Sequence, residues 1–154
     1  MRPRFEDLND AERDWLASCI GYAVQLVAAY SPADAGRPLA AAALDRTWAA
    51  YLATGDTDTD RINGVVNAIG FAFGQLLVDA AGFAWVVATD QYGTEMALLA
   101  LPGKGDVLVY PTNMVAKRWP SRETDFLVPL FGVITQQVLD VQANWPSPPP
   151  QFHG

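Results

Sequence analysis

The apolar positions of this chain follow two periods, one near its two ends and another in its middle. Over the first 81 residues and again near the end, apolar side chains recur every three to four residues, as in helices with one buried face. Between these regions, β-branched and aromatic residues are interrupted by turn-forming sequences, which is typical of short strands. The pattern predicts main helices over 10–30, 38–53, 60–81 and 124–143, strands over 83–89, 94–101 and 106–110, and a short helical turn over 114–119.

These elements predict an α+β fold in which a small three-stranded antiparallel meander carries about four helices, packed mainly on one face. Local signals mark several of the boundaries. Asn9 and Glu12 have the spacing of a capping box at the start of the first helix, and Gly82 is placed to end the third. Residues 90–93 join the first two strands as a turn, in which Gly93 supplies a positive φ.

Gly70 and Gly74 lie one helical turn apart within the third predicted helix. Glycine-rich loops bind phosphate, but such loops follow a strand, whereas these two residues lie inside a helical pattern. Glycine in a helix interior costs about 1 kcal/mol relative to alanine. We therefore expect a structural role, in which another helix or the strand hairpin packs closely against this face of the helix.

Composition places the chain among globular single domains. Its 154 residues are 51% hydrophobic and 18% charged, which suffices for a sizeable core without disulfides or metals. We expect one domain over 1–145, followed by a Pro-rich, flexible tail over 146–154. The net charge of −7 makes this an acidic protein and disfavours binding to nucleic acid or to anionic membrane surfaces.

The N-terminal residues show no secretory signal, because they become acidic without an apolar segment. The most apolar stretch, 65–87, is long enough to cross a membrane, but polar residues and Gly82 interrupt it. A buried core helix that leads into a buried strand explains this stretch better. The sequence therefore predicts a cytoplasmic protein without a membrane span.

Few residues are of the types that catalysis or metal binding requires. The single Cys19 and the single His153 cannot supply a Ser-His-Asp or Cys-His arrangement, or the ligands of a zinc site. The alternating aspartates of 56–60 are similar to the opening of a calcium loop, yet Arg61 and Asn67 occupy positions that require Gly and Glu. Helix capping explains these aspartates better. We expect no metal, no cofactor and no catalytic residues.

The turn at 90–93 and its flanks permit two interpretations. In the structural one, Asp90 bonds local backbone amides and Glu95 points to solvent from the second strand. In the functional one, Tyr92 stands exposed at the tip and anchors a partner, since aromatic side chains dominate interface energetics. Burial of Asp79, Asp90 or Glu95 would raise the carboxyl pKa toward the range of acid-base chemistry, but their spacing indicates no particular reaction.

Lys117 and Arg118 form an adjacent basic pair in this acidic protein. They follow Asn113, which is placed to cap the short helical turn. In one interpretation, one of the two basic side chains pairs with one of the three carboxylates named above and fastens the helical turn to the hairpin. In the other, Asn113, Lys117, Arg118 and the amides of the turn form a ligand-facing anion site.

Four segments carry a specific combination of motifs: GFAFGQLLV at 70–78, GFAWVV at 82–87, D-x-Y-G-T-E-x-A-L at 90–98 and P-x-N-M-V-A-K-R at 111–118. In this order they resemble the bacterial proteins grouped as domain of unknown function 3806, over roughly 60–139. The resemblance implies a bacterial, cytoplasmic domain and brings no activity, substrate or cofactor. It draws attention to a connected unit formed by Trp85, Asp90, Gly93, Lys117 and Arg118.

These observations favour a non-enzymatic module that binds a protein partner, of the adaptor or immunity-protein kind. Its contact surface is expected on the acidic helical surface or at the Tyr92 tip. The alternative is a small-molecule or anion-binding domain, with or without an enzymatic activity, whose pocket lies between the hairpin and the Lys117-Arg118 turn. The open edge of the meander also allows a homodimer.

Overall fold

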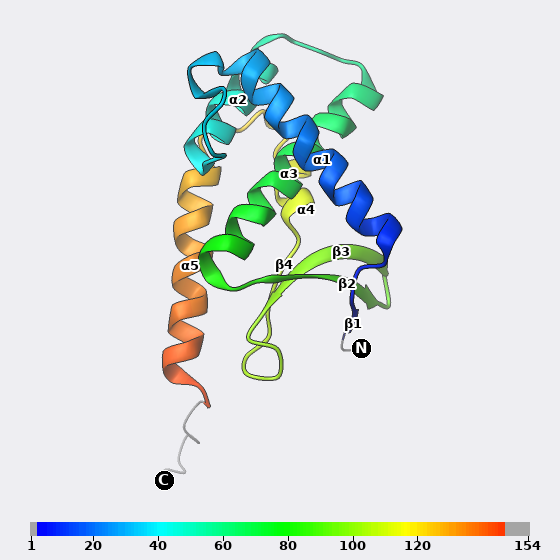
Figure 1. Ribbon diagram of the computed structural model, residues 1–154, viewed down its shortest axis with the longest axis vertical. Coiled ribbons are helices and arrows are strands. Elements are labelled where there is room, and N and C mark those ends of the chain that lie inside the picture. Colours follow the sequence, from blue (N-terminus) through cyan, green and yellow to red (C-terminus); the bar gives the residue numbers. More distant parts are fainter. Residues whose placement is uncertain (1–2, 147–154) are drawn as a thin grey trace.

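The computed structural model describes residues 3–146 and combines helices with one antiparallel sheet, which confirms the α+β class (Figure 1). Its helices are α1 (Asp10–Tyr30), α2 (Ala41–Ala53), α3 (Thr59–Ala81), α4 (Pro111–Ala116) and α5 (Leu127–Asn144), with the 3-10 helix η1 (Pro32–Asp34). Its strands are β1 (Arg4–Glu6), β2 (Ala84–Asp90), β3 (Gly93–Ala100) and β4 (Val107–Val109).

The sheet has four strands in the order β1-β2-β3-β4, so the prediction of three strands was wrong by one. The additional strand, β1, is three residues long and lies within the N-terminal segment, where Phe5 pairs with Ala88 of β2. Three residues are too few to show a period of two, which is why the sequence pattern did not reveal it. Because β1 covers the edge of β2, the edges of the described sheet are the short strands β1 and β4.

One face of the sheet packs against helices α1 and α3, which lie across it in Figure 1. Val87 of β2 is buried against Leu16 and Cys19 of α1 and Phe71 of α3. The largest apolar cluster connects α3 to α2 and α5. It also includes those residues of β3 and β4 that point toward the helices. Successive residues of a strand point to opposite faces, so the strands contribute every second residue to this core.

The opposite face of the sheet has its own apolar cluster, to which no helix residue belongs. Small buried residues of β2 and β3 form its floor, including Ala88 and Ala97. The half-buried side chains of Phe5, Leu108 and Tyr110 pack against this floor. The five α-helices are therefore packed mainly on one face, close to the four that the sequence predicted, and the other face is left to the strands themselves.

Most predicted boundaries depend on short-range hydrogen bonds that the structure confirms. The Asn9 side chain accepts from the backbone N–H of Glu12 at 2.8 Å, and the Asn9 N–H donates to the Glu12 side chain at 2.7 Å, which completes the capping box. Gly82 ends α3 with a φ of 72°. Asp58 caps α3 by accepting from the backbone N–H of Arg61 at 2.9 Å, as expected for the aspartate-rich loop.

Three helices begin three residues away from the predicted position. Helix α2 begins at Ala41 rather than at 38, because Ala40 is extended. Helix α4 begins at Pro111, so Asn113 lies inside it and does not cap it as predicted. Helix α5 begins at Leu127 rather than at 124, since Asp125 has a φ of 57° that no helix residue adopts. Pro129 lies in its first turn, where no backbone donor is needed.

Helix α3 is long and apolar enough to cross a membrane by length and composition, but 56% of its most apolar window is buried within the protein. Ile69, Phe73 and Leu77 of this helix are completely buried against the other elements. The polar residues that interrupt the apolar stretch lie on the remaining surface of the helix. Within the described chain, α3 is therefore the central helix of the core.

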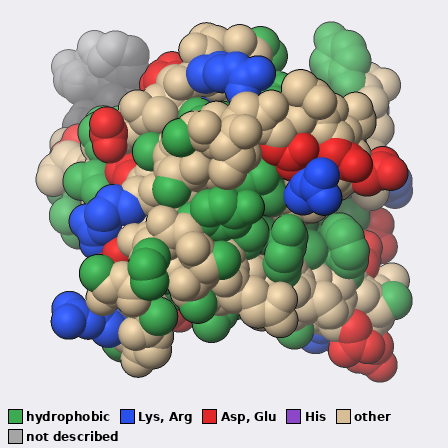
Figure 2. Space-filling view, turned by 90° about the horizontal axis from the view of Figure 1, so that it is seen from above, with side chains coloured by type: hydrophobic (Ala, Val, Ile, Leu, Met, Phe, Trp, Pro, Cys, Tyr) green, Lys and Arg blue, Asp and Glu red, His purple; other side chains and the backbone are tan. Residues whose placement is uncertain are grey.

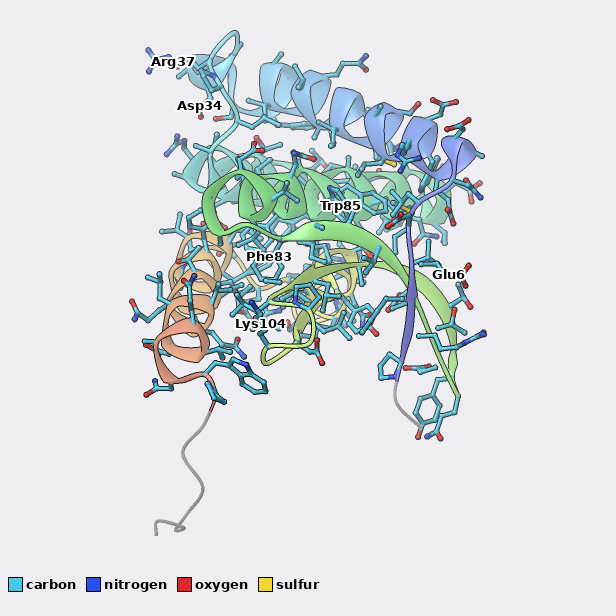
Figure 3. All side chains as sticks on the ribbon, turned by 60° about the horizontal axis from the view of Figure 1, so that its bottom comes forward. Glu6, Asp34, Arg37, Phe83, Trp85 and Lys104 are labelled. Atoms are coloured by element: carbon cyan, nitrogen blue, oxygen red, sulfur yellow. The ribbon has the colours of Figure 1, made fainter. Side chains whose placement is uncertain are left out.

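The close approach predicted at Gly70 and Gly74 is present on the face of α3 that meets α4 and the sheet. A Cβ atom on Gly70 would lie 2.6 Å from the Cα of Thr112, and one on Gly74 would lie 3.0 Å from Pro111 Cγ. Gly74 also faces the Trp85 ring, which lies between β2 and α3 in Figure 3. Glycine is required here because backbone and ring approach without space for a methyl group.

Replacing Gly70 with alanine is expected to lower the free energy of unfolding by about 1–2 kcal/mol. The steric conflict involves the backbone of Thr112, which cannot rotate away, and overpacking of this kind costs about 1–3 kcal/mol. The higher helix propensity of alanine returns up to about 1 kcal/mol of that cost. Urea unfolding followed by circular dichroism measures the difference. Gly21→Ala is the control: a Cβ there meets no atom within 4 Å, so this variant should gain stability, and equal losses would contradict the steric explanation.

Two aspartates outside the sheet are tied to arginines. Asp34 accepts hydrogen bonds from Arg46 Nε at 2.9 Å and Arg46 Nη2 at 2.8 Å, and one from the Ser31 hydroxyl. These bonds, led by those from Arg46, lower the pKa of Asp34 to about 2. Arg61 likewise lowers the pKa of Asp56. Both ion pairs connect segments that precede α2 and α3 to the helices themselves.

The Asp34 contacts are expected to make stability depend on pH in acid. The folded pKa of Asp34 lies below the ordinary value, so its stabilising effect is complete above about pH 4 and is lost as the pH falls toward about 2. The stability difference between the protein and its Asp34→Asn variant should therefore be constant from pH 7 to pH 5 and shrink below pH 4. Urea midpoints measured from pH 7 to pH 2 test this.

Asp14→Asn is the matched control for this acid dependence, because the exposed Asp14 forms no ion pair among residues 3–146. The difference between this variant and the protein should stay nearly constant over the same range. A difference for Asp34→Asn that stays unchanged down to pH 2 would show that the carboxylate contributes nothing through its charge.

Candidate functional site

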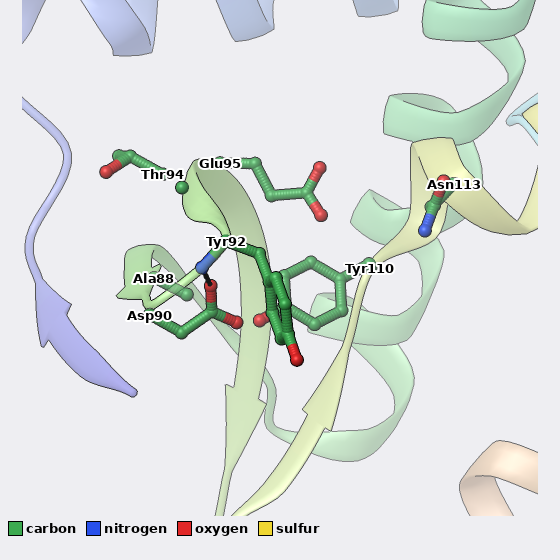
Figure 4. Close-up of a pocket in the computed structure, with 8 residues that line it drawn as sticks. Ala88, Asp90, Tyr92, Thr94, Glu95, Tyr110 and Asn113 are labelled. Carbon is green, nitrogen blue, oxygen red and sulfur yellow. Dashed lines mark hydrogen bonds between the residues drawn. The ribbon is translucent and has the colours of Figure 1, made fainter. Parts of the chain in front are cut away.

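A hollow of about 340 Å³ opens at the tip of the β2–β3 hairpin, on the sheet face that no helix covers (Figure 4). It is lined by the end of β2, the β2–β3 turn, the start of β3, Tyr110 after β4, and Asn113 in the first turn of α4. Its lining consists of Ala88, Asp90, Tyr92, Gly93, Thr94, Glu95, Tyr110 and Asn113. Four of the six predicted binding residues lie here, namely Asp90, Tyr92, Glu95 and Asn113.

The hairpin turn fixes the position of the Tyr92 backbone. Asp90 Oδ1 accepts a hydrogen bond from the Tyr92 N–H at 2.7 Å, and Gly93 has a φ of 138°, so both structural predictions for this turn are confirmed. Below the turn, the Thr89 and Thr94 hydroxyls are 3.0 Å apart across the strands. The Tyr92 side chain is 87% exposed. A large aromatic side chain thus stands in solvent on a backbone that is already ordered.

The carboxylates of Asp90 and Glu95 project from adjacent strands onto the same sheet face. Asp90 lies two residues after Ala88 on β2, and Ala88 pairs with Glu95 on β3, so all three share one side of the sheet. Partial burial raises the pKa of Glu95, and the nearby Asp90 raises it further. Burial and the same two carboxylates also raise the pKa of Tyr110. Among residues 3–146, no Lys or Arg lines the hollow, so the charges that these residues place there are negative.

Lys117 and Arg118 do not take part in this site. Arg118 Nε lies 3.2 Å from a carboxylate oxygen of Glu123, and its Nη1 donates to the Met114 carbonyl at 2.8 Å. Its guanidinium also lies 4.7 Å from the centroid of the Phe126 ring. The interpretation in which Arg118 pairs with a hairpin carboxylate is therefore wrong. Lys117 is exposed and forms no ion pair with any residue between 3 and 146.

The predicted connected unit is accordingly divided between three places: Asp90 and Gly93 line the hollow, Trp85 packs toward α3, and Lys117 and Arg118 lie outside the lining. Asn113 points toward the hollow, whereas the basic pair follows it outside the lining, so the three side chains do not assemble into an anion site. Trp85 lies on the helix side of β2, where its Nε1 donates to Gln75 Oε1 at 3.1 Å. Gln75 in turn donates to Asp79 at 3.2 Å. Asp79 therefore belongs to the surface of α3 and not to the hairpin site.

Sequence reasoning missed Tyr110, Thr94 and Ala88 as lining residues. The alternation of side chains along β2 places Ala88 beside Asp90, so a period-two reading of this strand would have found Ala88. Tyr110 could not be found in the same way, because it follows β4, and its place beside β3 depends on the register in which Leu98 pairs with Val109.

The lining of the hollow offers groups that can bind a ligand. The hollow offers carboxylate, amide and hydroxyl groups beside two aromatic rings, with no nucleophile held next to a base. Within residues 3–146, no group of three or more His, Cys, Asp and Glu side chains is placed to hold a metal. A negative hollow with aromatic walls attracts a positively charged group.

Comparison with known proteins gives a family and no relative of established activity. A family model described as "Domain of unknown function (DUF3806)" matches residues 46–128, which is more than half of the chain. The matched segment begins earlier and ends earlier than the resemblance suggested, and it includes most of α2 and the whole hairpin site. No curated protein and no solved structure matches the chain.

Proposed function

The chain belongs to the DUF3806 family, a description that names no activity, and we propose that it is a non-enzymatic protein-interaction module that docks its partner at the tip of the β2–β3 hairpin. The observation that carries this proposal is Tyr92, an 87% exposed aromatic side chain on a turn that is fixed by the Asp90 hydrogen bond. Little conformational entropy is lost when such a side chain is buried by a partner. Exposed aromatic anchors of this kind dominate interface energetics.

The surface around Tyr92 supports a docking role. Phe5, Leu108 and Tyr110 lie half-buried on the same sheet face, next to strands and not beneath a helix. A second hollow, of about 410 Å³, is lined by Pro3, Phe5, Asp106 and Leu108. Interfaces combine apolar contact area with polar groups at the rim, and this face offers both.

The acidic helical surface is a weaker candidate. Seen from above, over helices α1 and α2, acidic side chains are interspersed with basic and apolar ones and form no continuous patch on that face (Figure 2). The anion-binding alternative has less support still, since the basic pair and the hairpin hollow are separate. The hollow is large enough for a small ligand, and its charge favours a cation.

Affinity capture with quantitative mass spectrometry tests the proposal, with Tyr92→Ala as the test variant and Trp15→Ala as its control. Trp15 is 51% exposed on α1, away from the sheet face, so both variants remove one exposed aromatic ring. A partner should be captured by the protein and by Trp15→Ala. Its affinity for Tyr92→Ala should be weaker by roughly 30-fold, the loss expected when a central aromatic anchor is removed.

Thermal melting of both variants should match that of the unsubstituted protein, because neither ring is buried. A partner that binds Tyr92→Ala as well as it binds the protein would contradict docking at the hairpin tip. So would a partner that is lost equally from both variants, because that result would indicate non-specific aromatic contact.

A further inference from the structure

The two carboxylates in the hairpin hollow have no cationic partner among residues 3–146, although other acidic side chains there pair with arginine. Asp34 pairs with Arg46, Asp56 with Arg61, and Glu123 with Arg118. In the part of the chain that the structure describes, neither Asp90 nor Glu95 forms an ion pair. Asp90 bonds only the turn backbone, through one oxygen, and no hydrogen bond to the Glu95 carboxylate is present among residues 3–146.

The two negative charges disfavour one another in the free protein. Burial raises the pKa of Glu95, and the negative charge of the nearby Asp90 raises it further. The Tyr110 hydroxyl and the Asn113 amide border the same space and add further polar groups (Figure 4). A cation placed between the carboxylates would remove the repulsion and satisfy acceptors that the fold leaves open.

We propose that the hollow receives an arginine side chain of the partner protein, with its guanidinium between Asp90 and Glu95 and against the rings of Tyr92 and Tyr110. This inference rests on the proposed docking function and specifies the chemistry of the partner. Charge complementarity favours this occupant, because residues 3–146 contribute two carboxylates and no basic side chain to the lining of the hollow. Its volume of about 340 Å³ is ample for one long side chain.

Arginine fits this lining better than lysine does. Its guanidinium carries five N–H donors in a plane, which can serve two carboxylates and the Asn113 carbonyl at the same time. The plane also stacks on aromatic rings, and two tyrosines are available for this contact. A lysine ammonium has three donors on one atom and no plane that stacks on a ring, so it offers fewer donors and less contact to this lining.

The test is a nuclear magnetic resonance titration of the full ¹⁵N-labelled chain with three blocked tripeptides, acetyl-Gly-Arg-Gly-amide and its lysine and citrulline analogues. Citrulline has the shape of arginine without the charge. The arginine peptide should shift the backbone amides of Ala88, Tyr92, Gly93 and Asn113, with the lysine peptide weaker and the citrulline peptide weaker by roughly tenfold or more. High salt should weaken the arginine complex.

Asp90→Asn and Glu95→Gln give the matched variants, because both keep the side-chain shape, and the amide introduced by Asp90→Asn retains an oxygen for the turn bond. Each should weaken binding of the arginine peptide several-fold, whereas Asp14→Asn, which removes a carboxylate on α1, should leave it unchanged. Equal binding of the citrulline peptide, equal binding of the lysine peptide, or shifts located elsewhere would each overturn the proposal.

The same variants separate this inference from the proposed function. A captured partner that depends on Tyr92 but binds equally to Glu95→Gln and Asp90→Asn would overturn the arginine inference and leave the docking function in place. Conversely, specific binding of the arginine peptide without any Tyr92-dependent partner would support a guanidinium site and count against the protein-docking function.

Discussion

Replacing Trp48 with alanine is expected to lower the free energy of unfolding by about 3–5 kcal/mol, the range for removing a large aromatic side chain from a core. Trp48 is completely buried on α2. Its ring centroid lies 6.0 Å from that of Trp119 and 6.4 Å from that of Phe126, so it supports the segment between α4 and α5. Its Nε1 donates to the Glu123 carbonyl at 2.9 Å. The substitution removes both the contact area and this hydrogen bond.

Equilibrium unfolding in urea, followed by far-ultraviolet circular dichroism, measures the loss. Two variants separate its causes. Trp48→Phe keeps an aromatic ring but not the N–H donor, so its loss should be smaller than that of Trp48→Ala. Trp15→Ala removes an indole that is 51% exposed and should change stability by no more than about 0.5 kcal/mol. A loss below about 1 kcal/mol for Trp48→Ala would mean that the cluster collapses around the space or was never tightly packed.

The sequence predicted those parts of the fold whose determinants are close together in the chain. The capping box at Asn9, the left-handed end of α3 at Gly82 and the turn at Gly93 each depend on residues no more than three positions apart. The helix spacing of Gly70 and Gly74 also predicted a close approach. The sequence could not identify the residues that approach these glycines, because Thr112 and Trp85 come from elements whose position depends on the whole fold.

For the candidate site, too, the sequence predicted contacts between residues that are close together in the chain. Asp90, Tyr92 and Glu95 belong to one hairpin, so the sequence alone brings them together, and Asn113 joins them through the return of the chain after β4. One of the two interpretations of the basic pair had Lys117 or Arg118 paired with Asp79, Asp90 or Glu95, because the sequence does not rank the acidic neighbours of Arg118 by distance. Its partner, Glu123, lies only five residues ahead, in a segment whose turns the sequence pattern did not reveal.

The start of α5 shows the limit of sequence reasoning most clearly. No side chain near Leu127 in the sequence caps this helix. The carboxylate of Asp45, on α2, accepts hydrogen bonds from the backbone N–H of Leu127 at 2.9 Å and of Val128 at 3.0 Å. A cap supplied by a residue some 80 positions away leaves no local signal. The predicted start at 124 was therefore too early.

Replacing Asp45 with alanine is consequently expected to lower the free energy of unfolding by about 2–4 kcal/mol. Asp45 is only 5% exposed, and its removal leaves two backbone donors at the start of α5 without an acceptor, each of which costs about 1–3 kcal/mol when buried. The negative charge also lies at the positive end of the helix, where it is stabilising. Urea unfolding followed by circular dichroism measures the total.

The control for Asp45 is Asp58→Ala, because Asp58 caps α3 from an exposed position in the adjoining sequence. Water can replace the carboxylate there, so this loss should be close to the typical value of about 1 kcal/mol for a cap. The loss of stability for Asp45→Asn should lie between the losses for Asp45→Ala and Asp58→Ala, since the asparagine keeps one acceptor oxygen and loses the charge. Equal losses for Asp45→Ala and Asp58→Ala would show that burial adds nothing to the cap. A larger loss for Asp45→Ala than for Asp58→Ala would instead show that Asp45 fixes α5 to α2. It would then also fix the segment that contains Glu123 and Phe126.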